Sequence, residues 1–454
     1  MLPMEKAGKL NLQIWDIAWP AILSNSSIPI LGLVDAAILG HLGTTQYLGA
    51  VAIGGAILSF LYWGFSFLRM GTTGLVAKAV GAGDRTGAML VLSQSSLLAL
   101  AIALLVFVLH PLWLDAGIAL MAPREQLGEL ARSYASIRIY SAPAVLTTYA
   151  CIGWFIGNRD TRWPLLVVVT TNVCNIALDF LFILGLQMAS DGAALATVIS
   201  EYLGCALAFY GVWRQLPGRP DSTFYQALRS WGAYQNLLTS SRHLIVRTSC
   251  LLFSFAFFTA MGEKLGPDIL AANTLLIQLI MLGAYGIDGF AYAAEALTGN
   301  RIGARDLKGF YAAVKLCARW SAGTAVLVSL TFLLLRQPLF SALTDLSAVQ
   351  DILVQYQWWL IALPLIAAPS YILDGIFIGT AETRYMMYTM LFSTLCVYLP
   401  TWYLTTSWGN QGLWLAFALF NGARGLTLQL CYWQLSRTNR WLPRKLNTTG
   451  VTIP

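Results

Sequence analysis

Long apolar segments recur along the chain and are separated by short polar stretches. An α-helix needs about 20 apolar residues to cross the hydrocarbon core of a bilayer, so each segment of this length predicts a membrane-spanning helix. The predicted spans are residues 13–42, 47–72, 91–112, 132–157, 163–187, 191–213, 244–264, 268–298, 320–336, 352–379, 386–407 and 411–435. The pattern therefore predicts an all-α polytopic membrane protein with twelve transmembrane helices.

The chain also repeats itself. The sequence IGNRDTR at residues 156–162 returns as IGTAETR at residues 378–384, a spacing of 222 between position 156 and position 378. GAGD at residues 81–84 matches GARD at residues 303–306 at the same spacing. Matches that keep one register indicate an internal repeat. Each copy contains six predicted spans, an even number, so both copies enter the membrane in the same direction and the repeat is parallel.

Four regions follow from this repeat. We expect a first six-helix lobe at residues 1–213, a basic cytoplasmic linker at residues 214–243, a second six-helix lobe at residues 244–435 and a cytoplasmic tail at residues 436–454. In transporters built from parallel repeats, the substrate path runs between the two lobes.

Composition narrows the class further. With 57% hydrophobic and only 11% charged residues, the chain lies outside the range of soluble globular proteins. The seven cysteines and three histidines show no metal-ligand spacing, and no glycine-rich phosphate loop is present. We therefore expect no catalytic site, no metal and no cofactor, and the chain is not predicted to be an enzyme.

The net charge of +7 is best explained by membrane topology. Lys and Arg gather in alternate loops, and the positive-inside rule then places both termini in the cytoplasm. The basic residues form no stripe of the kind that binds nucleic acid. Four further arginines fall within predicted spans: Arg69, Arg138, Arg247 and Arg424.

An acid inside the first predicted span, Asp35, is the first candidate for function, because a carboxylate in a membrane helix is costly unless it is protonated, paired or hydrated. Counting 1.5 Å per residue puts Asp35 about 9 Å, Asp179 about 12 Å and Thr197 about 9 Å below the outer ends of their spans. Asn175 lies one turn before Asp179 on the same face. Pro20 permits a kink in the first span.

Two carboxyl groups close together in a low dielectric both favour protonation, so this layer predicts a proton-binding site. The alternative for Asn175 and Asp179 is that they only join helices by hydrogen bonds.

The second half places its charges late in spans that run inward. Asp288 and Glu295 lie in one span, Asp374 in another, and Arg69 lies late in the second span of the first half. Pairing of Arg69 with Asp288 or Asp374 would close an inner gate near the cytoplasm. Fixed salt bridges between helices explain the same residues equally well.

Four sequence segments carry a family resemblance. They are PILGLVDAAILGHL at residues 29–42, LRMGTTGL at 68–75, GAALAT at 192–197 and IDGFAYA at 287–293. Together with the twelve spans and the parallel repeat, they resemble the multidrug and toxic compound extrusion (MATE) family, and its DNA-damage-inducible F (DinF) branch in particular. The resemblance implies a V-shaped, two-lobed exporter of the bacterial inner (plasma) membrane. Such a protein exchanges external cations for cytoplasmic cationic or amphipathic compounds.

The resemblance also maps family roles onto this chain. It assigns ion coupling to Asp35, Asn175, Asp179 and Thr197, and helix bending to Pro20. One departure concerns the seventh span, where sodium-coupled relatives carry a glutamate and residues 244–261 here contain no acid.

We therefore expect a proton-coupled antiporter for small-molecule drugs or toxins that works by alternating access as a monomer in the bilayer. Sodium coupling stays open as an alternative. A flippase for lipid-linked saccharides is a second alternative, but it would need a cationic cavity, whereas the interior of the first lobe looks acidic.

Overall fold

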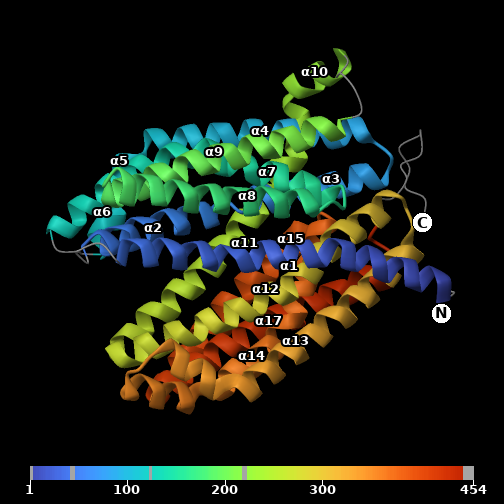
Figure 1. The fold of residues 1–454 in the computed structure, drawn as a ribbon. Coiled ribbons are helices and arrows are strands. Elements are labelled where there is room, and N and C mark those ends of the chain that lie inside the picture. Colours follow the sequence, from blue (N-terminus) through green and yellow to red (C-terminus); the bar gives the residue numbers. More distant parts are fainter. Residues whose placement is uncertain (1–3, 41–45, 122–124, 217–221, 443–454) are drawn as a thin grey trace. The chain divides into compact units, whose positions relative to one another are not determined.

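The computed structural model describes residues 4–40, 46–121, 125–216 and 222–442, and none of these residues lies in a β-strand (Figure 1). The helices of the first half are α1 (Met4–Gly40), α2 (Gln46–Gly64), α3 (Phe67–Gly81), α4 (Arg85–Val108), α5 (His110–Met121), α6 (Glu125–Arg138), the 3-10 turn η1 (Ile139–Ser141), α7 (Ala142–Gly157), α8 (Arg162–Asp179), the π-helix η2 (Phe180–Gly185), α9 (Ala189–Gln215) and α10 (Ser222–Arg229).

The helices of the second half are α11 (Trp231–Lys264), α12 (Pro267–Gly303), α13 (Leu307–Leu343), α14 (Ser347–Gly379), α15 (Thr383–Phe392), the π-helix η3 (Ser393–Tyr398), α16 (Leu399–Leu404), the 3-10 turn η4 (Thr406–Trp408) and α17 (Asn410–Arg437). Within the described residues, each predicted span overlaps one helix or consecutive helices. Nine helical segments among the described residues are long and apolar enough to cross a membrane. The prediction of an all-α polytopic membrane protein is confirmed.

Some predicted spans are interrupted in ways that the sequence pattern did not indicate. The second span breaks between α2 and α3, where Phe65 and Ser66 close short turns onto Tyr62 and Trp63. The fourth changes to 3-10 geometry just before Pro143, a residue that has no backbone N–H to donate. π-Helical turns such as η2 and η3 often lie at functional sites.

The sequence repeat is also a structural repeat. α7 and α14 end in the same motif, with Asp160 N donating to Phe155 O at 2.9 Å and Glu382 N donating to Phe377 O at 3.0 Å. The residues before these donors, Arg159 and Ala381, have φ values of 64° and 51°. This six-to-one bond with a left-handed residue is the Schellman motif. The same motif occurs at both positions because the two copies of the repeat have similar sequences there.

The turns after α3 and α12 form a second matching pair. Asp84 N donates to Ala79 O at 2.9 Å, and Asp306 N donates to Arg301 O at 2.8 Å. The left-handed residues are Gly83, with φ of 77°, and Arg305, with φ of 56°. The two copies therefore share the geometry of their helix ends as well as their sequence.

The chain forms two compact units. Unit 1 contains the residues from Arg242 onward together with the segments up to Ala18 and from Ala77 to Asp84. Unit 2 contains residues 19–76 and 85–241. Both α1 and α3 therefore run from one unit into the other, and α1 changes unit at Ala18, two residues before Pro20.

Small residues allow the helices of each unit to approach closely, as is typical of membrane bundles. In unit 1, a Cβ added at Gly375 or Gly379 of α14 would lie 2.5 Å or 2.2 Å from a carbonyl oxygen of α12. In unit 2, a Cβ added at Gly153 of α7 would lie 2.5 Å from the carbonyl oxygen of Arg69 in α3.

Candidate functional site

Three of the predicted coupling residues gather in unit 2 between α8 and α9, which pack side by side. Asn175 and Asp179 lie one turn apart at the end of α8, and Thr197 lies in α9. All three are buried, and Asp179 has no exposed surface at all. The structure therefore brings together a carboxyl group, an amide and a hydroxyl group on facing helices.

Two hydrogen bonds determine which atoms of Asn175 and Thr197 act as donors. Asn175 Nδ2 donates to Thr197 Oγ1 at 3.3 Å. Thr197 Oγ1 donates in turn to Ala193 O at 2.9 Å. The buried Asn175 Oδ1 accepts no hydrogen bond from the described residues. The amide therefore offers an acceptor to a protonated carboxyl group or to a cation.

Close packing holds α9 against the π-helix that follows α8. A Cβ added at Gly192 would lie 3.1 Å from the backbone of Phe182 in η2. Ile38 and Leu39 of α1 pack in one buried cluster with Ile183 of η2 and Ala193 of α9. This part of α1 therefore runs past the same group of helices.

Asp35 lies in α1 one turn before Ile38, but its side chain lies outside the described residues. Its contact with Asp179 stays a prediction. Pro20 is buried in α1 within unit 2, close to the point where the helix changes unit.

A second polar cluster in unit 2 surrounds Arg138 at the end of α6. Arg138 Nη1 donates to the hydroxyl group of Tyr134 at 3.2 Å. The hydroxyl groups of Tyr62 and Ser141 are 3.3 Å apart, and Glu201 of α9 lies within Coulombic range of Arg138. The sequence pointed to this cluster through Arg138, since an arginine inside a span needs an acidic or polar partner. It also pointed to Glu201, which continues the polar stripe of Thr197 by one turn.

Unit 1 contains a buried ionic cluster centred on Asp374 of α14. Arg247 of α11 donates from Nη2 to Asp374 Oδ2 at 2.5 Å, and Arg424 of α17 donates from Nη2 to the same oxygen at 3.0 Å. Sequence analysis identified all three residues but did not predict these pairs. Which arginine meets which acid depends on the rotation and packing of three helices, and no local sequence pattern encodes that.

The other residues of the predicted inner gate lie in both units. Glu295 is buried in α12 and Asp288 is half-buried about two turns before it. Arg69 lies in the part of α3 that belongs to unit 2. The predicted pairing of Arg69 with Asp288 or Asp374 stays a prediction. The partners that the structure gives Asp374 are Arg247 and Arg424.

The ends of α3 and α12 meet within unit 1 at a seam of small residues. A Cβ added at Gly81 would lie 2.0 Å from the Asn300 carbonyl oxygen, and one added at Gly303 would lie 2.1 Å from the Lys78 carbonyl oxygen. The repeat spacing relates Gly81 to Gly303 and Lys78 to Asn300. The two contacts are therefore copies of each other, as in an interface with twofold symmetry.

A third contact lies on the axis of this symmetry. A Cβ added at Gly299 would lie 2.6 Å from the Cβ of Ala77, and the repeat spacing relates these two positions to each other. We call these six residues the glycine seam: Ala77, Lys78, Gly81, Gly299, Asn300 and Gly303.

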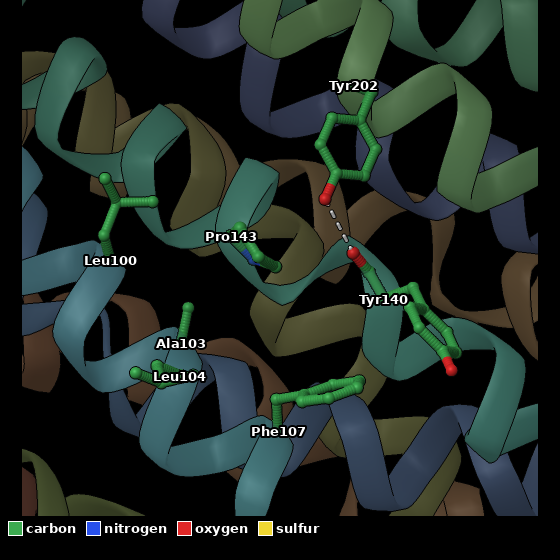
Figure 2. A pocket seen from close by; sticks show the side chains of 7 residues that line it. All are labelled: Leu100, Ala103, Leu104, Phe107, Tyr140, Pro143 and Tyr202. Atoms are coloured by element: carbon green, nitrogen blue, oxygen red, sulfur yellow. Dashed lines mark hydrogen bonds between the residues drawn. The ribbon is translucent and has the colours of Figure 1, made fainter.

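Unit 2 also has a small pocket of about 260 Å³ between α4, the start of α7 and α9. Figure 2 shows its apolar lining and the hydrogen bond from the Tyr202 hydroxyl group to Tyr140 O at 3.0 Å. Its lining residues are Leu100, Ala103, Leu104, Phe107, Tyr140, Pro143 and Tyr202. None of these lining side chains carries a charge. Within the described residues, no group of three or more His, Cys, Asp or Glu side chains is placed to hold a metal ion.

Comparison with known proteins gives the same repeat and decides the family. A sequence model of the MatE family matches the chain twice, at residues 20–181 and at residues 244–404. The chain belongs to the MatE family. DNA damage-inducible protein F of Escherichia coli (strain K12) is 37% identical over 429 residues, which are 94% of this chain and 93% of that protein. The predicted DinF branch is thereby confirmed.

Solved structures confirm the fold of this MatE-family chain. A MOP superfamily transporter from Pyrococcus furiosus superposes with a TM-score of 0.85 at 21% identity, over 94% of this chain and 96% of that chain. A MATE crystal structure in the bent conformation superposes with a TM-score of 0.83 at 20% identity, over 96% and 97%. The chain has the two-lobed, twelve-helix MATE fold and is a multi-pass membrane transporter of the multidrug-efflux type.

Proposed function

We propose that the chain is a proton-coupled antiporter that exports cationic or amphipathic small molecules, and that its coupling site is the group formed by Asn175, Asp179 and Thr197 with Asp35. The observation that carries the proposal is the directed chain of hydrogen bonds from Asn175 through Thr197 to Ala193. It leaves Asn175 Oδ1 as the acceptor beside a fully buried acid.

A protonated carboxyl group fits this arrangement because it donates one hydrogen bond and carries no charge. In the outward-facing state, Asp35 takes up a proton and the polar group rearranges. Burial of the resulting neutral acid costs far less than burial of a carboxylate. Substrate and proton binding are linked reciprocally, so a bound drug lowers proton affinity as much as the proton lowers drug affinity.

Sodium coupling is the second candidate, and the same oxygen atoms favour it. Carboxylate, amide and hydroxyl oxygens are the ligands that hard cations prefer. The donor set around Asn175 therefore suits a small cation as well as a proton, and only a transport measurement separates the two.

The proposed conformational change is a bend of α1 at Pro20. The first part of α1 is held in unit 1, where Trp15 packs edge-on against Phe290 and Trp320, and Asn11 accepts a hydrogen bond from Trp320 Nε1 at 3.1 Å. From Trp19 onward the helix belongs to unit 2. Within α1, movement between the units is absorbed near Pro20, where proline already removes one backbone hydrogen bond.

Two solved MATE structures are described as bent and straight conformations, which supports the same kind of change in this chain. We propose further that the glycine seam is the inner closure. It lies at the ends of α3 and α12 that the positive-inside rule assigns to the cytoplasm. Alternating access then requires Gly81 to separate from Asn300 and Gly303 to separate from Lys78.

The proposal places the protein in the bacterial inner membrane with both termini in the cytoplasm, acting as a monomer on drugs or toxins. Its test is efflux of a fluorescent cationic dye from reconstituted vesicles under separately imposed proton and sodium gradients. We expect the proton gradient alone to drive efflux and Asp35→Asn to abolish it. Full pH-driven efflux by Asp35→Asn would refute the mechanism, and efflux driven by sodium alone would establish the second candidate.

A further inference from the structure

The acid of unit 1, Asp374, is held by cations that belong to the chain itself. Arg247 and Arg424 come from two different helices, α11 and α17, and both donate to Oδ2 of Asp374. All three residues are more than nine-tenths buried. A carboxylate at this position needs a positive partner because it has lost its hydration, and here two guanidinium groups provide it.

Further polar groups keep Arg424 in place. Arg424 Nη1 donates to Asn421 Oδ1 at 3.2 Å, and its guanidinium group lies 5.6 Å from the centre of the Phe420 ring. A guanidinium group on an aromatic ring with fixed hydrogen bonds is held in one orientation. The arginine cannot leave Asp374 without breaking these contacts as well.

The charges within the cluster do not favour a further cation. One carboxylate, Asp374, faces two guanidinium groups, those of Arg247 and Arg424. These three side chains therefore have no excess negative charge that would attract a cation from solution.

Arginine also remains charged at every physiological pH. Both arginines donate to Oδ2, so a proton or a sodium ion would have to bind at Oδ1 of the same carboxylate. A proton there would neutralise Asp374 and leave two buried guanidinium groups without their negative partner, and a sodium ion would add a third positive charge beside them. Ion binding at Asp374 is thus opposed by the two arginine charges.

We propose that Arg247 and Arg424 are tethered counter-ions that close Asp374 to protons and sodium, and that they thereby exclude this acid from ion coupling. This inference rests on the proposed function in assuming that the transporter is coupled to a cation. It adds the residues that keep the buried acid of α14 out of that coupling.

The test measures cation uptake by purified full-length protein, with radioactive sodium at equilibrium and with proton uptake in weakly buffered solution. The double variant Arg247→Gln/Arg424→Gln leaves Asp374 without its counter-ions. Its matched control is the triple variant that also carries Asp374→Asn. We expect the double variant to take up about one cation per chain more than the triple variant, because only the double variant keeps the carboxyl group that binds the cation. Equal uptake would overturn the proposal.

A second comparison keeps the result decisive if the variant without both arginines does not fold. Arg247→Gln/Asp374→Asn removes one charge of each sign and keeps the net charge of the cluster. We expect wild type and this variant to take up equal amounts of sodium and protons. If wild type takes up one cation more, Asp374 is itself an ion site and the proposal is wrong.

Gradient-driven efflux by the wild-type protein is measured in parallel. If no cation gradient drives efflux, the proposed function fails. The uptake comparisons use no transport step, so they still decide whether the arginines close Asp374 to ions.

Discussion

Replacing one of the two symmetry-related glycines of the seam by alanine, Gly81→Ala or Gly303→Ala, should open the inner closure, and the two changes should have equal effects. The added Cβ would lie 2.0 Å from Asn300 O in the first variant and 2.1 Å from Lys78 O in the second. Carbon and oxygen atoms that are not bonded rarely come closer than 3.0 Å, so α3 and α12 must separate by about 1 Å. Overpacking of this kind costs about 1–3 kcal/mol.

This cost falls only on the closed state if the seam separates during transport. The ratio of open to closed molecules should then rise by about 5-fold to 150-fold, the factor that corresponds to 1–3 kcal/mol. Spin labels attached at Ala82→Cys and Ala304→Cys, in a background without native cysteines, report this ratio through the distances between them. Both alanines are exposed and are related by the repeat spacing.

The matched control is Gly323→Ala, because a Cβ at Gly323 meets nothing within 4 Å. It should leave the distance distribution unchanged. If the ratio of open to closed molecules rises for Gly81→Ala but not comparably for Gly303→Ala, the seam is not symmetric. If both variants have the distance distribution of the control, the seam is not a closure.

Three further predictions test other parts of the account. Thr197→Val leaves Asn175 Nδ2 without its acceptor, which should lower the free energy of unfolding by about 1–3 kcal/mol and slow pH-driven efflux. Thr197→Ser should restore both the Tm and the efflux rate. If Thr197→Val has the Tm and the efflux rate of wild type, the hydrogen bond plays no part in the mechanism. Pro20→Ala restores a backbone N–H inside α1 and should slow efflux at equal expression, measured with the same dye, whereas efflux at the wild-type rate would exclude a bend at this residue. Burial raises the pKa of Glu382, while Lys78 and Arg384 oppose the shift. A carboxyl group with a raised pKa stabilises the fold at low pH and loses that contribution as pH rises through its folded pKa, so Glu382→Gln should equal wild type in Tm at acidic pH and exceed it at neutral pH. A Tm difference that does not change with pH would contradict this.

The twelve spans and the parallel repeat could be predicted because both are written in local sequence. Apolar length encodes a span, and equal turns such as those at Arg159 and Ala381 encode the repeat. Asn175, Asp179 and Thr197 could be predicted as one group because depth along a straight helix can be counted. For Asn175 and Thr197 the structure adds the hydrogen bond itself.

Contacts that depend on helix rotation could not be predicted in the same way. The pairs of Asp374 with Arg247 and Arg424 join three helices that are far apart in sequence, although an arginine inside a span already indicates that an acid lies nearby. The packing of Trp15 with Phe290 joins the first part of α1 to α12 within unit 1, and no local pattern encodes it. The glycine seam could not be predicted either. Its glycines are seen to let α3 and α12 approach closely only when the packing of these two helices is known.

The central claim is that drug and proton compete through the acids of unit 2, and proton release on drug binding tests it most directly. Purified protein in a weakly buffered solution should release about one proton per chain when a saturating drug is added, as reciprocal linkage requires. Asp179→Asn should reduce this release strongly, while Asp115→Asn, at an exposed acid paired with Arg132, should leave it unchanged. No release from the wild-type protein, or undiminished release from Asp179→Asn, would contradict the account.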